Sequence, residues 1–144
     1  MNNIRQISVF VENKPGRLSA ITQILRDNGI NIRALSIADT KDFGILRLIV
    51  DAPDKACSKP REASCTVTIT EVVAISIPDE TGALNEIMSL IRDEEVNIEY
   101  MYAFLSKTEN KASIILRVDD TEKAHEAFSK GGIIQLTEKD ICEM

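Results

Sequence analysis

The sequence has few of the side chains that metal and redox chemistry require. It contains one histidine, no tryptophan and three cysteines, and no two cysteines form a CxxC pair. Ligands of this number and spacing do not make a transition-metal site, and three cysteines cannot all pair internally. Unpaired thiols are typical of a reducing compartment. We therefore expect a cytoplasmic protein that carries no metal and no cofactor.

The sequence also lacks an excess of positive charge and a long apolar segment. Its net charge of -6 argues against a nucleic acid or an anionic membrane as the main partner. No apolar run reaches the roughly 18 residues of a membrane span, and the N-terminus has no signal-peptide pattern. The hydrophobic content of 44% and the charged content of 28% are typical of a folded soluble protein.

What the sequence does contain is one pattern used twice. Residues 12–38 fall on residues 78–104 when the chain is shifted by 66 positions. The matched positions include Gly16 with Gly82, Leu18 with Leu84, Asn31 with Asn97, and Ile32 with Ile98. A chain of 144 residues has room for two small domains of roughly 70 residues each. We predict two domains, residues 1–70 and residues 71–144.

Hydrophobic periodicity and turn residues predict the same order of elements in each half. Pro15 and Gly16 suit a helix entry, and Gly29 suits a helix end. In the first half we predict strands at 4–11, 30–38 and 43–50, helices at 16–26 and 53–59, and loops at 39–42 and 59–62. In the second half we predict helices at 83–93 and 121–129, strands at 96–105, 112–118 and 133–137, and a hairpin turn at 106–110. The β-rich run 65–77 is too long for one ordinary strand, so we interpret it as two strands joined almost directly.

Each half is therefore βαββαβ, an α+β and ferredoxin-like arrangement with an antiparallel sheet and both helices on one face. The helix-covered faces are predicted to contain Ile7, Val9, Val11, Leu46, Leu48 and Val50, and Val73, Ile75, Ile77, Ile114, Leu116 and Val118. The opposite face is semi-apolar around Phe10, Ile45, Ile49, Ala74 and Ile115. A sheet face of this kind is a partner surface, so we predict a homodimer formed through it.

The first unit closely resembles an ACT domain, a small regulatory module that binds amino acids and other small metabolites. The resemblance rests on Asn13-Lys14-Pro15-Gly16-Arg17-Leu18 and on Gly29-Ile30-Asn31-Ile32. The second unit matches more loosely, as Asp79-Glu80-Thr81-Gly82-Ala83-Leu84 and as Val96-Asn97-Ile98. The resemblance covers nearly the whole chain. It implies a stand-alone tandem ACT protein, not an enzyme, that binds a free amino acid at the interface between ACT-like domains and acts in allosteric regulation.

The chemistry of an amino acid fits the same residues. A helix N-terminus offers unpaired N–H groups and a partial positive charge that accept a carboxylate. Gly16 and Gly82 let a ligand approach the backbone, and the Asn13 amide can bond either end of a zwitterion. In the family the ligand also lies against the second strand of a neighbouring domain, which implies a role for Asn31 and Asn97. The predicted ligand-binding residues are Asn13, Lys14, Pro15, Gly16, Arg17, Leu18, Asn31, Ile32, Asp79, Thr81, Gly82, Ala83, Leu84, Asn97 and Ile98.

Simpler interpretations stay open for several of these residues. Asn13 and Asp79 could serve only as helix caps, and the glycines could serve only turn geometry. Lys14 and Arg17 could be solvated charges. Asp79 and Glu80 would repel a carboxylate, so the second site is expected to be the weaker one.

Two other functions also stay open. The chain could be a regulatory subunit that docks on an amino-acid biosynthetic enzyme, as small acetolactate-synthase-like subunits do. It could be an acylphosphatase-like hydrolase in which Arg17 and an asparagine hold phosphate, although that chemistry needs a cradle with more than one glycine. RNA binding by a sheet face is disfavoured because strands 45–50 and 113–118 carry no stacking aromatic residues.

Overall fold

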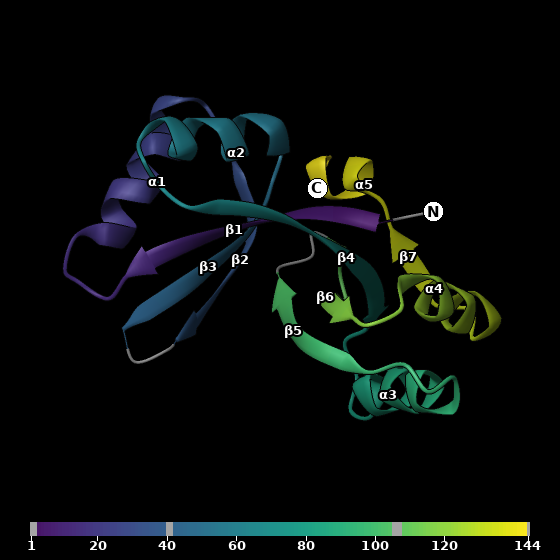
Figure 1. Cartoon of the computed structure of the whole chain (residues 1–144). Coiled ribbons are helices and arrows are strands. Elements are labelled where there is room, and N and C mark those ends of the chain that lie inside the picture. The colour runs from purple at the N-terminus through teal and green to yellow at the C-terminus, as the bar shows by residue number, and fades with distance from the viewer. Residues whose placement is uncertain (1–2, 40–41, 105–107, 144) are drawn as a thin grey trace. The chain divides into compact units, whose positions relative to one another are not determined.

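The chain forms two compact units (Figure 1). The structure, a computed structural model, describes residues 3–39, 42–104 and 108–143. The first unit is Arg5–Thr70, and the second is Glu71–Met144 together with the residues up to Ile4. Both predicted hairpin turns, at 39–42 and 106–110, include residues outside the described ranges. None of the described helices is both long and apolar enough to cross a membrane.

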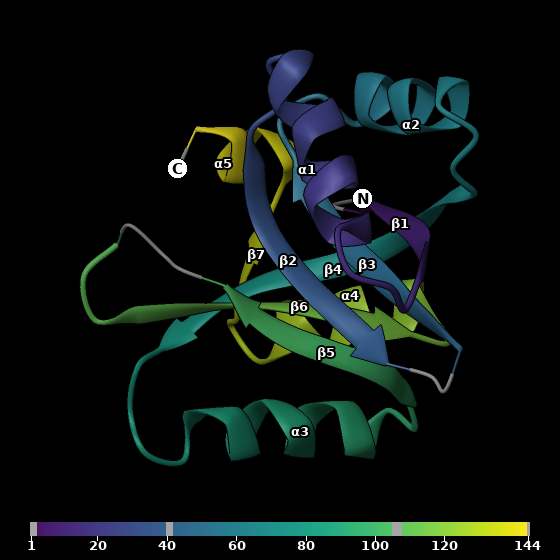
Figure 2. The ribbon, with the colours of Figure 1, turned by 90° about the vertical axis from the view of Figure 1, so that its left-hand side faces the viewer.

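The first unit is built on an antiparallel sheet of order β2-β3-β1-β4. Its elements are β1 (Asn3–Glu12), α1 (Arg17–Asp27), β2 (Ile32–Asp39), β3 (Phe43–Val50), α2 (Pro53–Glu62) and the start of β4 (Val67–Pro78). β1 and β3 pair with Val9 opposite Leu46. Figure 2 shows α1 and α2 lying near each other beside these strands. The six residues predicted for the helix-covered face all belong to this unit's core, where Ile21 and Leu25 of α1 join them.

The second unit repeats the arrangement with the order β5-β6-β4-β7. Its further elements are α3 (Ala83–Asp93), β5 (Ile98–Phe104), β6 (Lys111–Val118), α4 (Thr121–Lys130), β7 (Ile134–Leu136) and α5 (Glu138–Cys142). The six residues predicted for its helix-covered face again lie in one core, with Ile87, Ile91 and Phe128 from the helices. The α+β, ferredoxin-like prediction is therefore confirmed for both units.

Two helices differ from the sequence prediction. The segment 59–62 was expected to be a loop, but α2 continues through Pro60 to Glu62. The Pro60 ring is buried together with Ala56 and Cys57, so its packing offsets the missing N–H. The short helix α5 was not predicted. It begins with a capping box in which the Thr137 hydroxyl accepts from the Asp140 N–H at 3.1 Å and the Thr137 N–H donates to the Asp140 carboxylate at 2.8 Å.

The run after residue 65 and the sheet face away from the helices also need correction. The run forms one strand, β4, of 12 residues. The opposite sheet face was expected to be a partner surface, which requires it to be exposed in a single chain. This is wrong for Ile49, Ala74 and Ile115, since their exposed fractions are 2%, 0% and 0%. Phe10 is exposed as expected, with an exposed fraction of 43%. The homodimer remains a prediction, and the three buried residues cannot contribute to its interface.

His125 joins separate segments of the second unit. Its Nε2 atom lies 2.7 Å from the Asn3 amide oxygen, and its Nδ1 atom bonds the Gln135 amide oxygen. The Asn3 amide nitrogen donates to the Glu71 carboxylate at 3.1 Å, which turns the Asn3 oxygen toward the ring. Because both ring nitrogens face acceptors, both donate only when the imidazole is protonated.

Replacing His125 with Leu should therefore destabilise the second unit. The half-buried amide oxygens of Asn3 and Gln135 would lose the imidazole as their hydrogen-bond partner, at a cost of about 1–3 kcal/mol. Urea unfolding measures the change in the free energy of unfolding. Lys123→Leu, at an exposed position of the same helix, is the control and should change stability by less than about 0.5 kcal/mol. Equal effects of the two substitutions would show that the His125 bonds contribute nothing.

Candidate functional site

The entry to α1 is a tight turn that we call the first glycine turn, Lys14–Arg17. The Arg17 N–H donates to the Lys14 carbonyl oxygen at 3.3 Å, which closes the turn. Pro15 occupies its second position, and Gly16 follows with φ 84° and ψ −8°. These angles define a type II turn, which needs a positive φ at the third position. Glycine adopts that angle without strain, so Gly16 sets the direction in which α1 leaves β1.

The second unit contains the same turn, the second glycine turn, Glu80–Ala83. The Ala83 N–H donates to the Glu80 carbonyl oxygen at 3.2 Å, and Gly82 has φ 89° and ψ −10°. No side chain caps α1 or α3, so Asn13 and Asp79 do not have the simpler role considered from the sequence. The first N–H groups of each helix therefore lack a capping side chain and point toward the turn.

The two glycine turns differ in the charges that surround them. Glu12 precedes the first glycine turn and forms ion pairs with Lys14 at 3.1 Å and with Arg17 at 3.7 Å. The hydrogen bond from Lys14, with the charges of Lys14 and Arg17, lowers the pKa of the Glu12 carboxyl group. Two cations thus face one carboxylate, and the first turn of α1 has no acidic residue. The first glycine turn is accordingly suited to an anion.

The second glycine turn carries the opposite charge. Asp79 and Glu80 lie within it or next to it, and Glu86 adds a carboxylate in the first turn of α3. No lysine or arginine occupies the positions that match Lys14 and Arg17. The two turns therefore share a backbone conformation but differ in the ligand charge that they favour.

The predicted asparagines are held by a feature that the sequence reasoning missed. The Asn31 N–H donates to the Asp51 carboxylate at 2.9 Å, and the Asp51 N–H donates back to the Asn31 carbonyl oxygen at 3.2 Å. Asn97 and Asp119 repeat the pair at 3.0 Å and 3.1 Å. The signal was present in the sequence, because an aspartate follows the third strand of each unit. This carboxylate clamp fixes the backbone that leads into β2 and β5, while the asparagine side chains stay exposed.

A single unit does not bring all the predicted residues together. The first glycine turn lies at the start of α1, and Asn31 lies beyond its end, so 11 helical residues separate them. At 1.5 Å per residue this is about 16 Å. Leu18 and Leu84 are exposed beside the turns, whereas Ile32 and Ile98 pack against the two cores and Ala83 is buried. A ligand that touches both a turn and an asparagine would have to lie between two domains.

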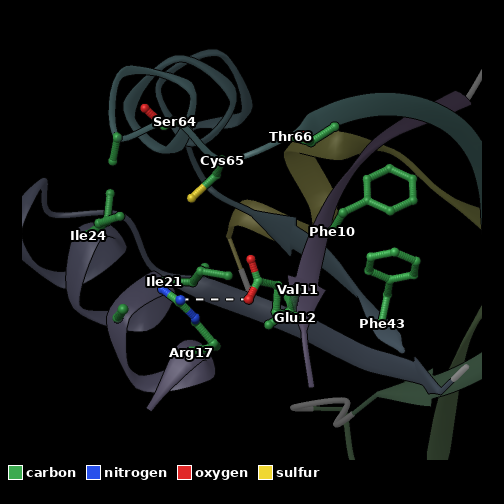
Figure 3. A pocket seen from close by; sticks show the side chains of 12 residues that line it. Phe10, Val11, Glu12, Arg17, Ile21, Ile24, Phe43, Ser64, Cys65 and Thr66 are labelled. Atoms are coloured by element: carbon green, nitrogen blue, oxygen red, sulfur yellow. Dashed lines mark ion pairs between the residues drawn. The ribbon is translucent and has the colours of Figure 1, made fainter. Parts of the chain in front are cut away.

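A cavity of about 550 Å³ opens beside the first glycine turn, and sequence reasoning did not find it. Figure 3 shows Phe10 and Phe43 on one side of it and Ile21, Ile24 and Cys65 on the other. The Glu12–Arg17 ion pair lies between these groups. No simple sequence signal marks the cavity, because its walls come from segments as far apart as Phe10 and Thr66. In the described part of the chain, no group of three or more histidine, cysteine or carboxylate side chains could hold a metal ion.

Two βαββαβ units, each with a glycine turn before its first helix, define a tandem class of small α+β modules. The family model for the ACT domain pair matches residues 2–144. The chain therefore belongs to the ACT domain pair family, and the resemblance stated from the sequence is confirmed.

Three proteins illustrate what this chain is similar to. The crystal structure of a protein from Bacteroides thetaiotaomicron is 39% identical, with a TM-score of 0.93 over 99% of this chain and 97% of that one. The ligand-free regulatory subunit of aspartate kinase from Thermus thermophilus shares the fold, with 17% identity and a TM-score of 0.62 over 90% and 91% of the two chains. A probable acetolactate synthase small subunit from Archaeoglobus fulgidus is 24% identical over 110 residues, which are 64% of this chain and 69% of that protein.

The carboxylate clamp gives a test of how the start of β2 is held. Asp51→Ala should remove the acceptor of the Asn31 N–H and destabilise the first unit by about 1–3 kcal/mol, because the bond involves a charged group. In this variant, hydrogen exchange of the Asn31 backbone N–H should become faster. Asp51→Asn keeps an oxygen acceptor and should exchange more slowly than the alanine variant. Unchanged exchange of Asn31 in Asp51→Ala would show that the clamp does not hold this segment.

Proposed function

We propose that this chain is a non-catalytic regulatory protein that binds a free amino acid at the first glycine turn. The observation that carries the proposal is the start of α1, which lacks a side-chain cap and is flanked by Lys14 and Arg17. An exposed helix N-terminus with nearby cations suits a carboxylate. Membership of the ACT domain pair family and the regulatory subunit of aspartate kinase among the structural relatives support a regulatory role.

In this proposal the ligand lies between two domains. Its carboxylate is bound by the N–H groups of the first turn of α1, where Gly16 leaves room for close approach. The amide of Asn31 or Asn97 in a facing domain binds the ligand from the other side, since the length of α1 keeps Asn31 away from the turn of its own unit. The facing domain belongs to this chain or to a second copy in the proposed homodimer. The second glycine turn is the weaker site because its charges are negative.

A thermal-shift screen against all amino acids should first identify the ligand. At about 100 times its dissociation constant, a ligand that binds only the folded state stabilises it by about 2.7 kcal/mol. With that ligand, calorimetry on Gly16→Ala should show binding at least tenfold weaker than wild type, because the added methyl group faces the carboxylate. Gly29→Ala is a matched control. Both glycines have positive φ, 84° and 66°, and in both cases the new methyl group meets no atom within 4 Å.

Equal losses of affinity in these two variants would indicate backbone strain rather than a contact with the ligand.

Asn31→Ala and Asn97→Ala then test the facing side. At least one should weaken binding about tenfold or more, because a hydrogen bond to a charged group contributes about 1.5–3 kcal/mol. If Gly16→Ala and both asparagine variants bind like wild type, the ligand is bound elsewhere.

A second candidate function is that of a subunit that docks on an amino-acid biosynthetic enzyme. The similarity to a probable acetolactate synthase small subunit favours it, and it is compatible with amino-acid binding. Tagged protein added to native cell extract should then retain one biosynthetic enzyme. The activity of the purified pair should change when the amino acid is added, and it should stop responding with Gly16→Ala. An enzyme activity that is the same with and without the chain would reject this candidate.

A further inference from the structure

The cavity beside the first glycine turn forms where β1 continues past its neighbouring strand. The Phe10 N–H donates to the Thr66 carbonyl oxygen at 3.0 Å. Before Thr66 the chain turns away toward α2, whereas β1 runs on to Glu12. Residues 63–66 therefore form one wall and leave a space between themselves, the end of β1 and α1.

This wall is ordered before any ligand arrives. The Ser64 N–H donates to the Arg61 carbonyl oxygen at 3.0 Å, and the Cys65 N–H donates to the Pro60 carbonyl oxygen at 2.9 Å. Ser64 has φ 68°, a left-handed conformation that reverses the chain after α2. These bonds anchor the wall to the end of α2. A preformed wall reduces the entropy that binding would otherwise cost.

The inner surface of the cavity is mainly apolar. Ile21 and Ile24 contribute one face from α1, and Phe10 and Phe43 contribute the opposite face from the sheet (Figure 3). Ala20 of α1 also lines the cavity. The volume of about 550 Å³ lies within the roughly 300–1,000 Å³ of small-molecule sites. The polar side chains on the wall after α2 are the hydroxyls of Ser64 and Thr66 and the thiol of Cys65.

Two opposite charges lie at this apolar space. Glu12 Oε2 and Arg17 Nη2 are 3.7 Å apart, and their side chains are 54% and 53% exposed. An ion pair that is this exposed and this long contributes little to stability. A ligand can therefore replace one partner of the pair and bind the other at a small cost in free energy. The charges of a zwitterionic amino acid match the pair, with its ammonium group toward Glu12 and its carboxylate toward Arg17 and the start of α1.

We propose that the cavity is the side-chain pocket of the amino-acid site, and that the ligand is an amino acid with a large apolar side chain. This inference rests on the proposed function and adds the class of ligand to it. The α-carbon lies at the ion pair, and the side chain enters between α1 and the two phenylalanine rings. Burying a large aliphatic or aromatic side chain there favours it over a small or charged one by about 10- to 100-fold in affinity.

The test is to fill the pocket from its exposed side. Ala20 lines the cavity yet lies on the exposed surface of α1, so Ala20→Leu occupies the space without a change in the core. Gln23→Leu is the matched control, because Gln23 is exposed on the same helix and does not line the cavity. Calorimetry measures the affinities of leucine, isoleucine, methionine and phenylalanine, and of alanine, serine, aspartate and lysine, for the three proteins.

Wild type and Gln23→Leu should bind one of the large apolar amino acids at least tenfold more tightly than the small and charged ones. Ala20→Leu should bind that ligand at least tenfold more weakly than wild type does. Its affinity for alanine should stay within about twofold of the wild-type value. Should Ala20→Leu fail to fold, NMR on wild type decides, since the ring signals of Phe10 and Phe43 should shift with the apolar ligand.

The outcomes separate the two proposals. If no amino acid binds wild type, in the screen against all amino acids or in calorimetry, the proposed function fails and the inference fails with it. If alanine, serine, aspartate or lysine binds most tightly, the inference is overturned while the proposed function stands. The same holds if Ala20→Leu binds the apolar ligand like wild type, or if the Phe10 and Phe43 rings do not respond to it.

Discussion

The left-handed glycine between the first strand and the first helix is the constraint on which each unit depends. Gly16 and Gly82 let the chain reverse within a type II turn, so that α1 and α3 pack back on the strands that precede them. That reversal places Ile21 and Leu25 of α1 in the first core, and Ile87 and Ile91 of α3 in the second. It also leaves each helix without a side-chain cap at its start. The conformation that completes the core therefore also leaves N–H groups at the start of α1 and α3, and at the first turn the neighbouring cations make that surface suited to an anion.

The two units share this backbone conformation and differ in its charges. Lys14 and Arg17 face one carboxylate, Glu12, at the first turn, while Asp79, Glu80 and Glu86 surround the second. The asparagine–aspartate clamps, in contrast, are almost identical in the two units. In both units the clamp bonds the backbone just before β2 or β5 begins. Lys14 and Glu80 occupy matched positions and are both exposed, so the charge there can differ without a change in the core. The two units can therefore share one fold while their turns differ in charge.

The sequence predicted what depends on short-range periodicity and missed what depends on distant packing. β3 and α3 begin and end where the apolar spacing placed them, and the twelve residues predicted for the helix-covered faces all lie in the two cores. The extension of α2 through Pro60 was missed because the burial of that ring is not visible in a local pattern. The cavity was missed for the same reason, since Phe10 and Cys65 meet only after β1 and β4 pair. The clamp and α5 were different cases: their aspartates and the Thr137 cap were readable, but were not connected to a structure.

The length of α1 has a consequence for regulation. Because about 16 Å of helix separates the first glycine turn from Asn31, one unit cannot supply both sides of the proposed site. A ligand bound on both sides would contact two domains at once, and it would stabilise only the arrangement in which they face each other. Its binding free energy then favours that arrangement over others, and the shift is limited by the difference in affinity between them. In the proposed site, the preformed side-chain pocket of one domain would select the ligand. The exposed amide of the facing domain would couple ligand binding to the arrangement of the domains.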